Sequence, residues 1–158
     1  MATSFQITAL PVEKFESLFA QSDEALSALG VRRVVAESKP NYPCRVSLVD
    51  AEIGEEVLII PFVHHDVLSP YRASGPIFVR MNARTASPEA DEIPSLLRSR
   101  QLSVRGYDAL AMMVSADVVN GNDLGLLIAK RFENGNIKYL HIHNASPGCY
   151  NCRVEWVG

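Results

Sequence analysis

The chain of 158 residues has few of the features that mark specialised protein classes. It has three cysteines, one tryptophan and no apolar run as long as a membrane-spanning helix, which argues against a disulfide-stapled domain and against a membrane protein. The first residues include no basic cluster followed by a long apolar run, so we expect no signal peptide. Three cysteines without an export signal fit reduced thiols, and we therefore expect a cytoplasmic protein.

The chain also lacks a large excess of charge of either sign. It has 15 basic and 18 acidic residues, and the formal net charge is −3 at pH 7. The basic residues are scattered and have no interleaved aromatic side chains, so we expect neither a nucleic-acid partner nor a membrane partner. Apolar residues make up 47% and charged residues 21% of the chain, as in ordinary globular proteins. At this length we expect a single domain over residues 1–158.

Short strand-like patterns dominate what is present. Apolar or alternating runs of strand length lie at residues 5–9, 31–35, 44–48, 57–60, 77–80, 102–105, 111–119, 137–143 and 150–157. Helical spacing covers residues 12–29, with a break at Ser22, and residues 124–131. Because the strands follow one another rather than alternate with helices, the pattern predicts an α+β fold with a mainly antiparallel β-sheet and two or three short helices. Residues 44–48 and 57–60 are expected to pair as a hairpin.

The segment 139–152 holds most of the reactive side chains. On a strand, His141 and His143 point to the same face. If a hairpin pairs His143 with Tyr150, His141 lies opposite Cys152, and two imidazoles and a thiol gather in one patch. A slip of one residue would instead turn Cys152 to the other face of the sheet.

Three interpretations of this segment stay open. His141 and His143 with Cys149 and Cys152 are ligand types suited to zinc, although the spacing is not that of a zinc finger. Alternatively, an imidazole activates Cys149 as a nucleophile or redox thiol, with Asn144 as a candidate orienting group. The third interpretation is structural, because cysteine and hydrogen-bonded histidine are common packing residues.

Arginine supplies eleven of the fifteen basic residues. Its planar guanidinium suits two-point contact with a carboxylate or a phosphate. Arg45 and Arg80 lie on expected strands, and Arg72 lies in a loop beside Tyr71. These four residues are candidates for holding an anionic ligand. The alternative is that the arginines pair with the protein's own acidic side chains.

Two further histidines, His64 and His65, follow the apolar run at residues 57–60. His65 and Asp66 are a candidate proton-relay pair. Adjacent residues on a strand point to opposite faces, so His64 and His65 cannot both serve one site without a bulge. We therefore expect them to be exposed polar groups of a loop.

Several short stretches together form a recognisable pattern. They are Pro43-Cys44-Arg45-Val46-Ser47-Leu48, Gly54-Glu55, Ser69-Pro70-Tyr71-Arg72, Gly75-Pro76-Ile77-Phe78-Val79-Arg80, Arg105-Gly106-Tyr107, His141-Ile142-His143-Asn144-Ala145 and Gly148-Cys149-Tyr150. In these stretches the chain resembles a family of small, mostly bacterial proteins known as domain of unknown function 1203 (DUF1203). The resemblance implies a cytoplasmic bacterial protein and carries over no activity, cofactor or site. Cys152 departs from the family's pattern, where a small residue is usual, which favours Cys149 with the two histidines as the reactive cluster.

The leading hypothesis is a pocket that binds a small anionic ligand, and whether the protein also acts on it as an enzyme stays open. In an enzyme, Cys149 would be the nucleophile and His143 or His141 its base. The ligand would be held by one or more of Arg45, Tyr71, Arg72 and Arg80. We expect no cofactor and no metal ligands, with zinc as the alternative. The competing hypothesis is a non-catalytic interaction module, monomeric or homodimeric, in which histidine and cysteine are structural.

Overall fold

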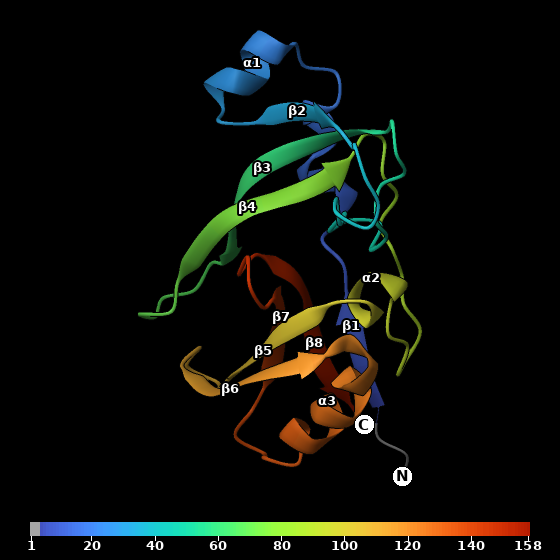
Figure 1. The fold of residues 1–158 in the computed structure, drawn as a ribbon. Helices are drawn as coiled ribbons and strands as arrows, with labels where there is room; N and C mark the ends of the chain where they lie inside the picture. The colour runs from blue at the N-terminus through green and yellow to red at the C-terminus, as the bar shows by residue number, and fades with distance from the viewer. Residues whose placement is uncertain (1–3) are drawn as a thin grey trace.

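The computed structural model describes residues 4–158 and has two antiparallel sheets, one above the other in Figure 1. The larger sheet has the strand order β1 (Ser4–Thr8), β8 (Tyr150–Val157), β7 (Tyr139–Asn144), β5 (Gln101–Tyr107) and β6 (Met113–Asn120). The smaller sheet has the order β2 (Arg32–Val35), β3 (Glu56–His65) and β4 (Ala73–Arg80). The predicted α+β class with antiparallel strands is confirmed.

Three short helices accompany the sheets: α1 (Asp23–Ala28), α2 (Ser95–Arg98) and α3 (Leu124–Phe132). The hydroxyl of Ser22 accepts a hydrogen bond from Ala25 N–H at 3.1 Å, which caps α1 at the expected break. Before that cap, the helical pattern forms two 3-10 turns, η1 (Val12–Lys14) and η2 (Glu16–Leu18), and a third, η3 (Gly121–Asp123), precedes α3. Within residues 4–158, no helix has the length and apolar character needed to cross a membrane.

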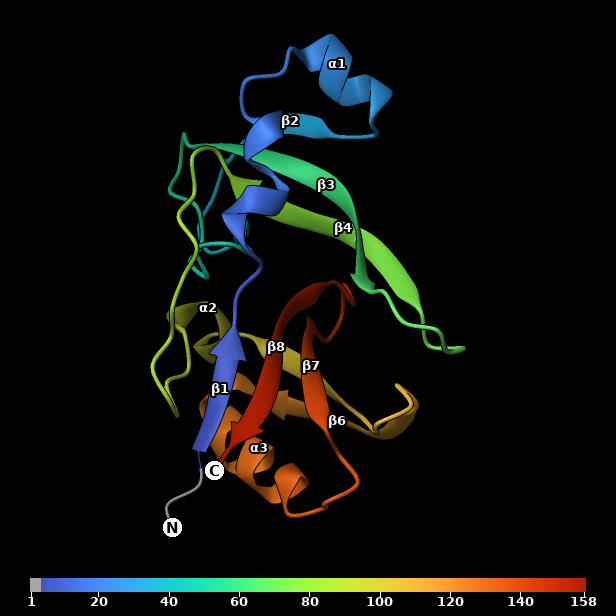
Figure 2. The ribbon, with the colours of Figure 1, turned by 180° about the vertical axis from the view of Figure 1, so that it is seen from behind.

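Each sheet has its own hydrophobic core. In the larger sheet, one face packs Leu140, Ile142 and Val154 against the buried side of α3. In the smaller sheet, Leu58 and Ile77 pack with residues of the amino-terminal segment and α1. The face of the larger sheet opposite α3 carries polar and aromatic side chains, which come from the strand positions that alternate with the core residues. The end of β3 descends toward this face, above the β7–β8 hairpin (Figure 2).

Residues 44–48 do not form the expected strand. They form turns, and Cys44 makes one isolated bridge to Phe78, at which Arg45 N–H donates a hydrogen bond to Phe78 C=O at 3.0 Å. In a half-buried strand, alternate side chains face the core and the solvent. Residues 43–46 are instead buried one after another, next to both sheets. Consequently β3 pairs with β2 and β4, and the predicted hairpin with residues 44–48 is wrong.

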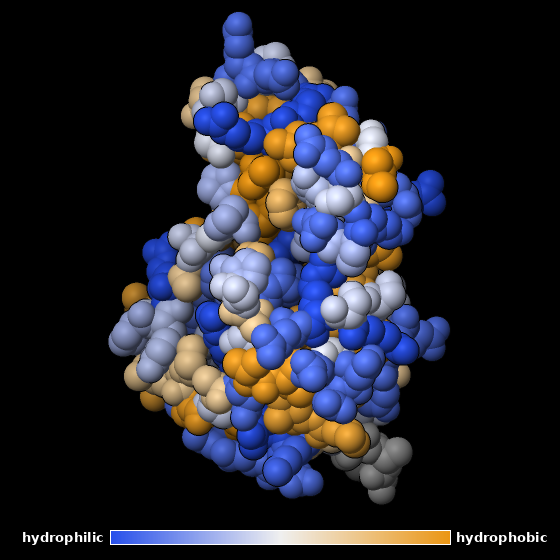
Figure 3. Space-filling view, viewed as in Figure 1, coloured by the Kyte–Doolittle hydropathy of each residue, from blue (hydrophilic) through white to orange (hydrophobic). Residues whose placement is uncertain are grey.

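The strand β6 forms one edge of the larger sheet. Its inward residues include Asp117, whereas Val114 and Val118 are exposed. Leu126 of α3 is exposed as well. Figure 3 shows an apolar region in the lower half of the molecule, the half that holds the larger sheet and α3 in Figure 1.

Candidate functional site

A β-bulge at the end of β3 places two adjacent histidines on the same side. Val63 pairs with Ser74 and His65 pairs with Ala73, so His64 is the extra residue between two regular pairs. The ring centroids of His64 and His143 lie 5.1 Å apart, and those of His65 and His141 lie 4.9 Å apart. The sequence indicated that His64 and His65 could contribute to one site only if a bulge lay between them, and this bulge is present. The expectation of exposed loop groups is wrong for both, because both lie in β3, His65 is buried and His64 is half-buried.

A second bulge sets the register of the β7–β8 hairpin. His143 pairs with Tyr150 as expected, but the next pair is Ile142 with Cys152, because Asn151 is an extra residue in β8. His141 therefore lies opposite Arg153, and its expected pairing with Cys152 is wrong.

The bulge at Asn151 turns Cys152 into the hydrophobic core on the far side of the sheet. Burial there raises the pKa of the Cys152 thiol to about 12. Cys152 thus does not share a face with His141 and His143. The zinc interpretation with two cysteines and two histidines, one of the three left open by the sequence, does not fit this register.

Histidines and tyrosines pack together where the end of β3 meets β7. The ring of Tyr150 stacks on His64 with a centroid separation of 5.2 Å. His65 is held at both nitrogens: Nδ1 donates to the Tyr71 carbonyl at 2.8 Å, and Nε2 accepts from the Tyr139 hydroxyl at 2.6 Å. Both ring nitrogens of His65 are therefore occupied by the fold itself.

The other three histidines each keep a buried nitrogen without a hydrogen-bond partner. These atoms are Nδ1 of His64, Nδ1 of His141 and Nε2 of His143. Nδ1 of His143 donates to the Gly148 carbonyl at 3.0 Å, so its Nε2 carries the free lone pair. An unsatisfied buried polar atom costs about 1–3 kcal/mol, and three such atoms lie in this one cluster.

All three of these imidazoles are neutral at pH 7. Burial lowers the pKa of His64 to about 4, that of His141 to about 2 and that of His143 to about 3. Positively charged neighbours, including Arg105 near His64 and His143, lower them further. A neutral imidazole offers a lone pair, and this is the form that acts as a base or as a metal ligand.

Arg45 is completely buried beside the histidines. Its Nε donates to the Tyr150 carbonyl at 2.7 Å and its Nη1 to the Pro43 carbonyl at 2.6 Å, while Nη2 has no partner. Within residues 4–158, no carboxylate lies within ion-pair distance of this guanidinium. Burial lowers the pKa of Arg45, while the adjacent Cys149 side chain opposes that shift through its charge when ionised and through a hydrogen bond to the guanidinium. A buried cation held only by neutral groups is normally expensive, because its charge is not compensated.

A cavity of about 350 Å³ lies between the smaller sheet and the turn that joins β7 to β8. Its lining includes Arg45, His64, Ser74, Phe78, Gly148 and Cys149, and no aspartate or glutamate. A neighbouring cavity of about 380 Å³, which extends toward Arg100 and Asn144, shares Phe78, Pro147 and Cys149 with the first. Cys149 therefore lies where the two cavities meet.

The thiol of Cys149 is held by an amide rather than by an imidazole. Asn144 Nδ2 donates to Cys149 Sγ at 3.3 Å, and Asn144 Oδ1 accepts from Asn151 Nδ2 at 2.8 Å. Asn144 thus contacts the thiol that it was expected to orient. In the part of the chain that the structure describes, no hydrogen bond joins this thiol to His141 or His143.

The remaining predicted ligand-binding residues lie away from the cavity. Tyr71 contributes its carbonyl to His65 and does not line the cavity. Arg72 pairs with Asp66 at 3.3 Å on the surface, so Asp66 is not the relay partner of His65. Arg80 pairs with Glu55 at 2.6 Å. Of the four candidates, only Arg45 lines the cavity with Cys149 and His64.

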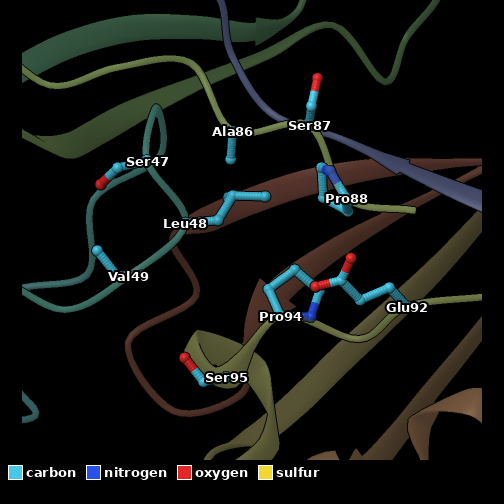
Figure 4. A pocket seen from close by; sticks show the side chains of 9 residues that line it. All are labelled: Ser47, Leu48, Val49, Ala86, Ser87, Pro88, Glu92, Pro94 and Ser95. Atoms are coloured by element: carbon cyan, nitrogen blue, oxygen red, sulfur yellow. The ribbon is translucent and has the colours of Figure 1, made fainter.

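Another pocket, of about 210 Å³, lies near the loops around Leu48 and Pro88 (Figure 4). Its only charged side chain is Glu92, whose carboxylate already accepts a hydrogen bond from Glu89 N–H. It has no histidine, cysteine or arginine. This pocket therefore lacks the reactive side chains that line the cavity between the smaller sheet and the β7–β8 turn.

Fold and site together define a small α+β protein with a histidine, arginine and cysteine cluster between two antiparallel sheets. The family model for "Protein of unknown function (DUF1203)" matches residues 41–156, and the chain belongs to this family. No curated protein and no solved structure matches the chain. The matched range includes every residue of the cluster.

Proposed function

We propose that the protein binds a small anionic ligand in the cavity between the two sheets. The observation that carries this proposal is Arg45, a fully buried guanidinium with an unpartnered Nη2 and no carboxylate in contact. An anion in the cavity would supply the negative charge that no carboxylate of the protein supplies to the Arg45 guanidinium. Arg45 also lines the cavity, which is open enough to admit a ligand of a few non-hydrogen atoms.

The electrostatics of the surroundings support the same class of ligand. The cavity lining has no acidic side chain, and its histidine is neutral at pH 7. Arg105, on β5 near His143, donates to the Ser103 hydroxyl at 3.3 Å, interacts with the Tyr107 side chain and has no ion-pair partner in residues 4–158. The local charge is therefore positive although the whole chain carries −3.

An enzymatic form of this proposal uses Cys149 as the nucleophile and His143 or His141 as its base. Asn144 would hold the thiol in place. A catalytic complex would require an imidazole to move within hydrogen-bond reach of the thiol, as can happen when a ligand binds. The three free cysteines support a cytoplasmic location, and we propose this compartment in a bacterial cell.

The cavity thiol itself can report anion attraction. We expect iodoacetate, which is anionic, to alkylate Cys149 faster relative to neutral iodoacetamide in the native protein than in a denatured chain. The native ratio should fall by about tenfold or more in Arg45→Gln, because a unit charge a few Å away changes the interaction energy by about 2–4 kcal/mol at an effective dielectric of 20. Peptide mass spectrometry on EDTA-treated protein measures both rates at Cys149.

Two controls accompany that experiment. Arg72→Gln removes an exposed arginine outside the cavity and should leave the ratio unchanged. Inorganic phosphate should slow alkylation of the wild-type chain more than potassium chloride at equal ionic strength, a test that requires no variant. Equal iodoacetate-to-iodoacetamide ratios in native and denatured chains, with no phosphate protection, would contradict anion binding.

The interaction-module hypothesis has one observation in its favour. The strand β6 is an edge of the larger sheet, so a second copy of the chain could pair with its free backbone groups, and its Val114 and Val118 side chains are exposed. Sedimentation of the purified chain distinguishes the two functions. A stable dimer combined with no anion preference at Cys149 would favour the module.

A further inference from the structure

We propose that His64, His141 and His143 form a binding site for a divalent first-row transition metal such as Zn²⁺. One nitrogen from each ring lies within 4.8 Å of those from the other two. This inference goes beyond anion binding and does not depend on it, because it uses the histidines rather than Arg45 or the thiol.

The site is assembled from both sheets. His141 and His143 project from one face of β7, and the bulge in β3 adds His64 from the smaller sheet. Each ring has a buried nitrogen with no protein partner, which is the arrangement that a bound cation would satisfy. His65, only one residue from His64, has both nitrogens occupied by Tyr71 and Tyr139 and is not part of the set.

The second contact of His143 is typical of a metal-binding histidine. Its Nδ1 donates to the Gly148 carbonyl, which fixes the tautomer and directs Nε2 to the cluster. In a tetrahedral zinc site with Zn–N distances of about 2.1 Å, ligand nitrogens lie about 3.4 Å apart. The three nitrogens must therefore move closer together by up to about 1.4 Å when a metal binds, and His64, on the bulge of β3, is the least buried of the three residues.

The donor set selects the class of metal. Three neutral imidazoles suit Zn²⁺, Cu²⁺, Ni²⁺ or Fe²⁺ and do not suit the oxygen-seeking ions Mg²⁺ and Ca²⁺. Three protein ligands leave one coordination position for water or another ligand. Because His64 also lines the cavity, that position is accessible to a molecule held there. Arg105 and Arg45 add positive charge nearby, so we expect weaker binding than at a site with a carboxylate ligand.

Metal titration of the untagged, EDTA-treated full chain tests this site. We expect one Zn²⁺ per chain in competition with a chromophoric chelator, and the visible absorption bands of tetrahedral coordination with Co²⁺. His64→Gln should weaken Zn²⁺ binding by at least about 100-fold, because it removes a direct ligand. The matched control His65→Gln, one residue away, should keep one Zn²⁺ per chain with an affinity within about tenfold.

Circular dichroism of both variants establishes that they are folded. The proposal is overturned if the wild-type chain binds neither Zn²⁺ nor Co²⁺ stoichiometrically, or if the two variants lose binding equally. Because the alkylation test of anion binding is done in EDTA, either result can fail without the other.

Discussion

At the residue scale, the degree of burial decides which of the three cysteine thiols is accessible to a ligand or reagent. Cys44 and Cys152 are completely buried, and burial raises the pKa of Cys152 to about 12, which keeps it in the unreactive thiol form. Cys149 is partly exposed between two cavities. The sequence already favoured Cys149 over Cys152, and the structure gives the physical reason, because of the three thiols only that of Cys149 lies within reach of a ligand.

A single glycine at the start of η3 sets how closely the chain passes α2. A Cβ at Gly121 would meet the Arg98 backbone at 2.7 Å and would overlap the Leu97 carbonyl, and neither backbone group can give way cheaply. We expect Gly121→Ala to lower the free energy of unfolding by about 2–4 kcal/mol, measured by urea denaturation.

The matched control is Gly125→Ala inside α3, where a Cβ meets nothing within 4 Å. This substitution should be neutral or should stabilise the fold by up to about 1 kcal/mol, because alanine favours the helix. If Gly121→Ala were as stable as Gly125→Ala, the close approach to the α2 backbone would be wrong.

At the element scale, one ion pair fastens α3 to the edge strand β6. Arg131 Nε and Nη2 each donate to a carboxylate oxygen of Asp117 at 2.6 Å, and both side chains are partly covered. The hydrogen bond from Arg131 lowers the pKa of Asp117. A lowered carboxyl pKa means that the pair contributes stability above the unfolded pKa and that this contribution is lost as the pH falls through the folded pKa.

Replacing this carboxylate therefore has a pH-dependent effect. We expect Asp117→Asn to destabilise the fold at pH 7 by about 0.5–1 kcal/mol, the usual size for a partly solvated pair. The difference from the wild-type chain should shrink toward zero as the pH falls to about 2, where both chains carry a neutral group. Denaturation at several pH values measures this, and a constant difference across that range would contradict the assignment.

The bulges at His64 and Asn151 also act at the element scale. Each inserts one residue, reverses the side-chain alternation beyond it and changes which groups meet between the sheets. Without the first bulge, His64 would face away from β7. Without the second, Cys152 would share the face of His141.

At the scale of the whole molecule, a buried ion pair joins parts of the chain that are distant in sequence. Arg100, before β5, contacts Asp50, in the segment between β2 and β3, through Nη1 at 2.9 Å and Nη2 at 2.6 Å. The two side chains are only 14% and 7% exposed. Arg100→Gln should lower the free energy of unfolding by about 2–3 kcal/mol, because it leaves a poorly solvated carboxylate without its partner.

The exposed Arg72–Asp66 pair is the comparison for this effect, since its side chains are 59% and 74% exposed. Arg72→Gln should change the free energy of unfolding by less than about 0.5 kcal/mol. Urea denaturation of both variants measures the difference. Equal effects would mean that burial of the Arg100–Asp50 pair is not what stabilises the molecule.

The sequence by itself determined the fold class and most strands, and it singled out Cys149, His141 and His143 as candidates whose role stays a prediction. Alternating apolar residues and turn formers predict local structure because side-chain spacing on a strand is a local property. The same logic failed at residues 44–48, where alternation suggested a strand but every residue from 43 to 46 is buried. Their partners come from both sheets, and such contacts leave no local periodicity.

Only the tertiary structure decided which reactive groups meet. Two single-residue bulges turned His64 toward the site and Cys152 away from it, and a register change of one residue reverses every face beyond it. Packing between the two sheets then selected Arg45 and left Arg72 and Arg80 paired with acids elsewhere. The physical reason is that register and inter-sheet packing depend on contacts between residues far apart in sequence, which local patterns do not encode.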